Sequence, residues 1–334
     1  MHSRVLTSVS LRLAPVLLVL CWGCGYTNID TASLIRSETT TNGFTMNGFT
    51  MNGFTMNGFT MNGFTMNGFT MNGFTMNGLA LNQSLFSAVT DSGTVLSGLN
   101  LIGAQAQITV QPSGQAMPVQ YKLRFDNIYV DPQKPSGDVY LYDISYTRSG
   151  ETTWTSLCAD ANGAPVPAIP IKNYWNTQTG ARIDNPNVVT FACVSGALGK
   201  CVRLGYRPWA QATKCVNQSC SAISLAGYHQ ACTRMIRADY CGNGSSYTLN
   251  GTLIEVYDGL SPQIQTRTSS WAIEGQWNPE GAFCIGDARH AELLAKGRYP
   301  DCNGDGNPGD VKKCGSNAEL KLSLLGSAFS SAPN

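Results

Sequence analysis

The chain has 334 residues, which is enough for one large domain or two ordinary ones. Charged residues make up 13% of it, the formal net charge is +1, and lysine and arginine do not cluster, so the composition excludes a nucleic-acid-binding surface. Low charge combined with 35 glycines indicates turn-rich β structure rather than a helical bundle.

The N-terminus has the features of an export signal. Two arginines precede an apolar run over residues 13–20, an order typical of a bacterial secretory signal. The run is too short to span a bilayer, which needs about 20 apolar residues. Gly23 stands directly before Cys24, as in a lipoprotein signal, although the bulky Trp22 fits that pattern poorly.

We therefore expect residues 1–24 to be a signal peptide of the lipoprotein type, with Cys24 as the lipidated residue. A plain cleaved signal is the alternative. Either prediction takes the protein out of the cytoplasm, to the outer membrane, the cell surface or the periplasm of a Gram-negative bacterium. The lipid would make the membrane a partner. Residues 25–41 would then be a linker.

A tandem repeat fills residues 42–81. The unit Asn-Gly-Phe-Thr-Met occurs seven times from Asn42 and ends in a variant at residues 77–81, and no charged residue lies between Thr39 and Thr90. Asn-Gly is a strong turn signal and Phe-Thr-Met suits a short strand, so one prediction is a short β-solenoid with a corner at each Asn-Gly. The unit resembles those of pentapeptide-repeat proteins, but its Met and its Gly before Phe depart from them. A flexible spacer and a surface that binds a ligand directly are the alternatives, and we expect the repeat to be a stalk.

Strands with alternating polarity follow the repeat, and we place the main domain at residues 82–300. Apolar and polar residues alternate in short runs that Gly, Pro, Asn and Asp separate, which is the pattern of half-buried antiparallel strands. The predicted strands cover residues 106–111, 119–125, 138–146, 188–193 and 251–257.

One long helix is predicted over residues 224–241. Its apolar residues, among them Tyr228 and Cys232, fall on one face. The glycines of residues 242–244 are expected to end it. A second, shorter helix is predicted over residues 287–296.

Cysteine usage also indicates export. Ten of the 12 cysteines lie beyond the signal, and this even number predicts up to five disulfides. Local bridges are plausible for Cys193 with Cys201 and for Cys302 with Cys314, whereas no cysteine or histidine spacing is that of a zinc site. The sequence therefore predicts an α+β fold that is predominantly antiparallel β and disulfide-stapled. Residues 301–334 would form a cysteine-bridged loop, rich in Gly and Asp, and a C-terminal tail.

Five stretches of the domain together resemble a known family. In chain order they are "LCADANGAPVPAIPIKNYWNTQTG", "FACVSGALGKCVRLGYRPW", "HQACTRMIRADYCGNG", "GTLIEVYDG" and "WAIEGQWNPEGAFCIGDAR". Over residues 95–300 the chain resembles the ADYC-domain proteins, which are named for the string at residues 238–241 and occur mainly in exported proteins of myxobacteria and similar bacteria. The resemblance implies an exported protein with a signal peptide and a short Gly-rich repeat ahead of the domain. The family has no assigned activity, so no catalytic residue carries over.

A hydrolase would need a general base beside a nucleophile or a water molecule. Beyond the signal the chain offers two histidines, His229 and His290, and the candidate carboxylates are Asp239 and Glu274. Neither a G-x-S-x-G nor an H-E-x-x-H motif is present. His229 falls on the apolar side of the predicted helix, where a structural histidine is the simpler interpretation.

Asp239 would lie in the last turn of the predicted helix, where the helix dipole disfavours an acid. We therefore expect it to have a basic partner, and Arg234 and Arg237 are near enough in sequence to provide one.

Two other features could bind ligands. Exposed aromatic rings can stack on sugars, although core positions explain large aromatic residues more simply; the candidates are Trp154, Trp175, Trp209, Trp271 and Trp277. The segment Asp301–Asn307 fits the opening of a calcium loop. Lys312 stands where the bidentate acid belongs, so Asp310 would have to replace it, and a Gly-rich turn explains the same letters. We assign no cofactor from the sequence.

These features favour an exported envelope protein whose repeat holds a surface or periplasmic binding module for a glycan or a protein. One alternative is a secreted hydrolase that uses His229 or His290 with Asp239 or Glu274. Another is a structural component of the envelope.

Overall fold

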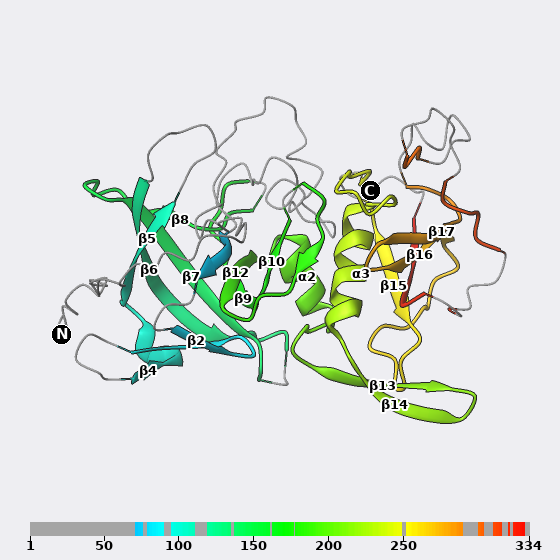
Figure 1. Ribbon diagram of the computed structural model, residues 1–334, viewed down its shortest axis with the longest axis horizontal. Coiled ribbons are helices and arrows are strands. Elements are labelled where there is room, and N and C mark those ends of the chain that lie inside the picture. The colour runs from blue at the N-terminus through cyan, green and yellow to red at the C-terminus, as the bar shows by residue number, and fades with distance from the viewer. Residues whose placement is uncertain are drawn as a thin grey trace, which may run out of the picture.

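The computed structural model is an α+β fold with two main β-sheets and two helices between them (Figure 1). Its paired strands are antiparallel throughout the described residues, where the one parallel contact is an isolated bridge between Ile285 and Lys313. The predicted fold class is therefore confirmed. The structure describes residues 71–75, 79–89, 95–110, 119–134, 137–160, 162–176, 178–248, 252–289, 300–303, 310–315, 320 and 323–330.

The larger sheet has seven strands in the order β1-β12-β9-β7-β6-β5, with β8 beside β7. Their bounds are β1 (Met71–Thr75), β5 (Gln105–Val110), β6 (Val119–Val130), β7 (Tyr140–Arg148), β8 (Thr155–Ser156), β9 (Ala168–Lys172) and β12 (Val188–Cys193). The predicted strands at 106–111, 119–125, 138–146 and 188–193 correspond to four of them. The edge strand β1 comes from the tandem repeat, and in this copy Asn72 and Gly73 lie inside the strand instead of forming a turn.

A three-stranded sheet covers one face of the larger sheet. It consists of β2 (Leu79–Asn82), β3 (Leu85–Val89) and β4 (Val95–Ser97), and a 3-10 turn, η2 (Gly98–Leu101), follows it. Phe86 of β3 is fully buried and packs against the rings of Phe125, Tyr142 and Phe191. Its backbone N–H donates to the Tyr142 hydroxyl at 2.9 Å. Aromatic packing therefore forms the core on this face.

The opposite face of the larger sheet packs against the helix α2 (Ala197–Arg203). Leu198 and Val202 of α2 share a core cluster with Ile169, Ile171 and Trp175. Because successive residues of a strand point to opposite faces, β12 contributes Phe191 to one core and Ala192 to the other. Trp175 belongs to a short hairpin of β10 (Tyr174–Trp175) and β11 (Arg182–Ile183).

The helix α3 (Ala226–Arg237) lies between α2 and the second main sheet, next to β15 and β16 in Figure 1. This sheet has the order β15-β18-β16-β17, with β15 (Ile254–Asp258), β16 (Ala272–Asn278), β17 (Gly281–Ile285) and β18 (Leu325–Phe329). Its core contains Met235 and Ile236 of α3 and Trp277 of β16. The segment expected to be a C-terminal tail thus supplies β18, which pairs with both β15 and β16.

The predicted end of the long helix is wrong. Its last helical residue is Arg237, and Ala238 follows in the left-handed conformation at φ 51°, the place that Gly242 was expected to take. The second predicted helix is not seen in its first three residues, 287–289, and the rest of it lies outside the described residues.

All ten cysteines from Cys158 onward are paired, as the even count predicts. The bridges are Cys158–Cys193, Cys201–Cys232, Cys215–Cys220, Cys241–Cys302 and Cys284–Cys314. Both predicted local bridges are wrong. Cys193 faces the core on one side of the larger sheet and Cys201 faces α3, so the two sulfurs point into different cores. The backbone of Cys314 bonds to Ile285, which places it beside Cys284 and away from Cys302.

These disulfides indicate an oxidising compartment outside the cytoplasm. Among the described residues, no helix has the length and apolar character needed to cross a membrane. The predicted signal peptide, Cys24, and the repeat up to residue 70 lie outside the described residues.

Candidate functional site

The string Ala238-Asp239-Tyr240-Cys241 reverses the chain directly after α3. Ala238 is fully buried at φ 51°, a conformation that costs a residue with a Cβ roughly 1–2 kcal/mol. The turn directs Asp239 and Tyr240 into the protein, and Cys241 forms a disulfide with Cys302. All three side chains are therefore held by tertiary contacts.

Asp239 is paired with an arginine of the preceding helix. Its Oδ2 accepts a hydrogen bond from Nη1 of Arg234, as expected, and another from the backbone N–H of Gly244 at 3.1 Å. Arg234 also donates to the carbonyl oxygens of Pro279, at 3.0 Å, and Thr179. The pair is buried, with 3% of the Arg234 side chain and none of the Asp239 side chain exposed. This carboxylate holds loops against the end of α3 and is closed to solvent.

Glu274 is the centre of a second buried ion pair. Its carboxylate accepts two hydrogen bonds from Arg289, one from the Tyr240 hydroxyl at 2.9 Å and one from the Ser327 hydroxyl at 2.8 Å. Arg289 also donates a hydrogen bond from Nη2 to the carbonyl oxygen of Met235 at 2.6 Å. The cluster therefore joins the end of α3, β16, β18 and the segment after β17. Burial, and then the charge of Glu274, raise the pKa of Tyr240 well above its usual value, so its hydroxyl keeps its proton.

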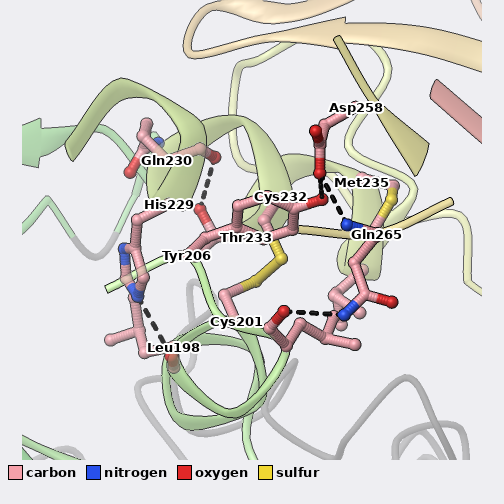
Figure 2. Close-up of a disulfide and its surroundings, with 12 residues drawn as sticks. Leu198, Cys201, Tyr206, His229, Gln230, Cys232, Thr233, Met235, Asp258 and Gln265 are labelled. Carbon is pink, nitrogen blue, oxygen red and sulfur yellow. Dashed lines mark hydrogen bonds between the residues drawn. A yellow bond between two sulfur atoms is a disulfide. The ribbon is translucent and has the colours of Figure 1, made fainter. Parts of the chain in front are cut away.

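His229 lies on α3 with its ring completely buried, which agrees with the structural interpretation. Its Nε2 lies 3.0 Å from the carbonyl oxygen of Leu198 on α2, so Nε2 carries the proton and donates (Figure 2). Burial lowers the pKa of His229 to about 3, against the effect of that carbonyl. A general base near neutral pH needs a much higher pKa and access to a substrate. His229 meets neither requirement.

A disulfide fixes the same helix pair beside this histidine. Figure 2 shows the Cys201–Cys232 bridge between α2 and α3, with His229 pointing to Leu198 on one side of it. On the other side the Tyr206 hydroxyl donates to Asp258 at 2.9 Å. The surroundings of this bridge are thus an internal scaffold.

The other predicted site residues do not form a site in the described part of the chain. His290 lies outside it, and so do residues 304–309 of the predicted calcium loop. The carboxylate of Asp310 accepts the backbone N–H groups of Cys302, at 2.6 Å, and Asn303, at 3.1 Å. It therefore closes the loop as a turn would. No group of three potential metal-ligating side chains is found among the described residues.

The tryptophans do not form an exposed platform. Trp175 and Trp277 are fully buried, and Trp154, Trp209 and Trp271 are half-buried. Both buried indole N–H groups have partners, in Gln230 at 2.8 Å and Ser327 at 2.9 Å. These positions are those of core residues and their supports.

A largely exposed hairpin is formed by β13 (Gln211–Val216) and β14 (Ser219–Ser224), and we call it the arm. In Figure 1 the arm runs along the lower side of the molecule, below the second main sheet. Its turn residues, Asn217 and Gln218, have φ of 48° and 67°, as in a type I′ hairpin turn. The Cys215–Cys220 bridge joins the two strands next to this turn, and Val216 at the tip is 57% exposed.

The base of the arm packs on the body through Ala212 and Ile223, which contact the core around α3. The backbone N–H of Ser261 donates to the Thr213 carbonyl at 2.8 Å, so the outer edge of β13 is occupied there. β14 pairs with β13 alone among the described strands. Its outer edge is the open backbone edge of this element.

A family model described as the ADYC domain matches residues 98–291, more than half of the chain. The chain belongs to the ADYC-domain family. No curated protein and no solved structure matches it. In this ADYC domain, the string that names the family holds together the polar clusters of Asp239 and Glu274.

Sequence reasoning missed two parts of this ADYC domain. The partner of Glu274 is Arg289, which no local spacing connects to it, because the contact arises from packing β16 against the segment after β17. The arm was not predicted either, although its sequence contains a pattern that indicates a disulfide-linked hairpin. Asn217-Gln218 stands midway between two cysteines five residues apart, which is the spacing of a disulfide across a two-residue turn.

Proposed function

We propose that this protein is an exported envelope binding module that takes up an extended segment of a partner protein along β14. The observation that carries the proposal is the open, uncharged edge of β14 on an arm that is held rigid by a disulfide. Addition of a strand to an exposed sheet edge is a common mode of peptide recognition, in which backbone hydrogen bonds supply much of the affinity.

The register of the arm identifies the backbone groups that face outward. Thr213 directs its carbonyl away from β14, towards Ser261, so its partner Ala222 also directs its N–H and C=O away from β13. The same alternation makes Cys220, which pairs with Cys215, point outward. Ala222 and Cys220 therefore offer donors and acceptors spaced for an antiparallel or parallel strand.

The side chains of β14 leave this edge unprotected. Natural sheets usually block an exposed edge with charges, prolines or bulges. β14 has the sequence Ser-Cys-Ser-Ala-Ile-Ser, with none of these, and every residue except Ile223 is exposed. The turn and the disulfide already fix the conformation of the arm. Binding of a partner would therefore cost little conformational entropy in the arm.

The partner is a protein rather than a glycan in this proposal. Among the side chains that the structure describes, no tryptophan, tyrosine or phenylalanine is fully exposed, so no stacking surface for sugar rings supports a glycan. The hydrolase alternative lacks support as well, because His229, Asp239 and Glu274 are enclosed and already bonded.

The proposal also includes a membrane anchor, which the predicted signal peptide and a lipid on Cys24 would provide. They would tether the ADYC domain to the outer membrane, facing the periplasm or the cell surface, where the five disulfides can form. The repeat would separate the domain from the membrane. Metabolic labelling with a fatty acid tests this part, since the label should be lost in Cys24→Ala.

Ala222→Pro tests the binding edge. The N–H of Ala222 points outward, so proline removes a donor from the edge without removing a bond between β13 and β14. The purified full-length protein is panned against displayed random peptides, and the affinities of selected peptides are measured by calorimetry. We expect extended, uncharged peptides that bind Ala222→Pro about ten-fold more weakly, which corresponds to the loss of roughly one hydrogen bond.

Ser221→Ala is the matched control, because it changes a neighbouring side chain of β14 and leaves the backbone edge intact. Peptides should bind it as they bind the wild type. Peptides that bind Ala222→Pro with undiminished affinity would contradict the proposal. Turnover of an ester, glycoside or peptide substrate that is lost in His290→Ala would favour the hydrolase.

A further inference from the structure

The larger sheet ends in a strand taken from the tandem repeat. We propose that the outer edge of β12 is a binding site for the repeat unit Met-Asn-Gly-Phe-Thr, and that other identical units of the same chain can occupy it in place of β1. The unit at residues 71–75 forms β1, which pairs antiparallel with β12 at Met71–Phe191, Phe74–Val189 and Thr75–Val188.

The backbone groups of β12 show which ones the repeat covers. Val188 accepts a hydrogen bond from the N–H of Asn173, and Val194 donates one to Pro167, both on the side of β9. Because these groups alternate in direction along a strand, those of Val189 and Phe191 face β1. In the register of this pairing, Phe191 lies opposite Met71 and Val189 lies opposite Phe74. Their amide hydrogens therefore report whether a repeat unit is bound.

The edge of β12 that faces away from β9 would be prone to aggregation if no strand were paired with it. The sequence of β12 is Val-Val-Thr-Phe-Ala-Cys, all six residues are buried, and none is charged. An apolar strand without charge or proline is a template for aggregation when its edge is open. The repeat supplies an uncharged strand of five residues for this edge.

Five other units have the same five letters as β1. They lie at residues 46–50, 51–55, 56–60, 61–65 and 66–70. Since their sequences are identical, any of them can make the same backbone pairs with β12, and they differ only in the length of chain that leads to β2. The link from β1 to β2 is residues 76–78, and use of the unit at 66–70 would lengthen it from three residues to eight.

The cost of that longer link is small. Loop-closure entropy grows with the 3/2 power of loop length, so the unit at 66–70 should bind about four-fold less often than β1, and the unit at 61–65 about nine-fold less often. The repeat units of one chain thus compete for the edge of β12, and the occupancy of each unit falls with its distance from β2. Each step shifts the repeat by five residues, or roughly 17 Å of extended chain, so the site also adjusts the length of the stalk.

Proline in the repeat tests the proposal in the full-length protein. Phe74→Pro removes the N–H and the strand geometry of the unit that forms β1. Hydrogen exchange at the amides of Val189 and Phe191 should then accelerate only about three-fold, because the unit at 66–70 and the more distant units together replace β1. The variant with Phe69→Pro and Phe74→Pro should accelerate it about six-fold. Phe49→Pro, in a distal unit, is the control and should change nothing.

The reference for an empty site replaces every phenylalanine of the repeat by proline: Phe44, Phe49, Phe54, Phe59, Phe64, Phe69 and Phe74. This variant should lose the protection of both amides. The proposal is overturned if Phe74→Pro alone loses as much protection as this variant. Should the fully substituted variant not fold, the graded response of the first two variants decides, and an all-or-none loss at Phe74→Pro overturns the proposal. Protection of Phe74→Pro that rises with protein concentration would do so too, because the unit would then come from a second copy.

Discussion

Replacing Glu274 by glutamine should destabilise the domain by about 3–5 kcal/mol. The side chains of Glu274 and Arg289 are both 0% exposed, so the substitution leaves the guanidinium charged and enclosed, without its counter-ion. Glutamine has nearly the same size and can still accept the Tyr240 hydroxyl. The loss therefore reports the charge and not a cavity.

The magnitude follows from the contacts of the carboxylate. Two of its four hydrogen bonds come from the Arg289 guanidinium, and hydrogen bonds to charged groups contribute about 1.5–3 kcal/mol each. Losing one or both gives the same range as breaking a buried ion pair. For a domain of this size the midpoint of thermal unfolding should fall by roughly 10 °C.

Denaturant unfolding under non-reducing conditions measures this loss, and a double-mutant cycle with Arg289→Met isolates the pair. The double variant should lose at least about 2 kcal/mol less than the sum of the two single losses, because each single variant leaves one buried group unpaired. Additive losses, or a Glu274→Gln variant within about 1 kcal/mol of the wild type, would refute the structural role assigned to this cluster.

Three further predictions concern the unfolding free energy at acid pH, after substitution of a glycine in a turn and after removal of a disulfide. Burial lowers the pKa of His229 to about 3, so below about pH 6.5 the unfolded chain binds a proton that the folded chain does not, and the unfolding free energy should fall by about 1.4 kcal/mol per pH unit down to about pH 3. The unfolding free energy of His229→Gln, measured in denaturant at several pH values from 7 to 4, should therefore fall less steeply with pH than that of the wild type. Gly242→Ala should cost at least about 3 kcal/mol in denaturant unfolding, since φ is +66° and a Cβ would lie 1.5 Å from a backbone oxygen, whereas Gly150→Ala, at φ +96° in open space, should cost about 1 kcal/mol. Opening the Cys241–Cys302 bridge, which spans 61 residues, by alanine at both positions should cost about 4 kcal/mol, and a loss below about 1 kcal/mol would contradict the bridge.

The strands and the long helix could be predicted because their patterns are local. β12 coincides with its predicted range of residues 188–193, and the apolar face of α3 is buried as its spacing indicates. The end of α3 could not be predicted in this way. A glycine is the usual left-handed residue after a helix, yet Ala238 takes that conformation because the buried pair of Arg234 and Asp239 holds the turn.

Contacts between distant segments account for what the sequence did not reveal. Counting cysteines predicted that they pair, but proximity along the chain suggested Cys193 with Cys201, whereas strand and helix direct those sulfurs into separate cores. The tandem repeat was predicted to form short strands, but nothing in it indicated that the unit at residues 71–75 joins the larger sheet, because its partner β12 lies more than 100 residues further along the chain. The arginine partner of Asp239 was predicted because it is five residues away.

Disulfide mapping tests the central claim, that this ADYC domain matures outside the cytoplasm as a scaffold tied by its cysteines. The protein is isolated from the cells that produce it, its thiols are blocked, and its peptides are analysed by mass spectrometry without reduction. The structure predicts the linkages Cys158–Cys193, Cys201–Cys232, Cys215–Cys220, Cys241–Cys302 and Cys284–Cys314 and no blocked thiol among these ten. Two or more free thiols, or a peptide that links Cys193 to Cys201, would contradict it.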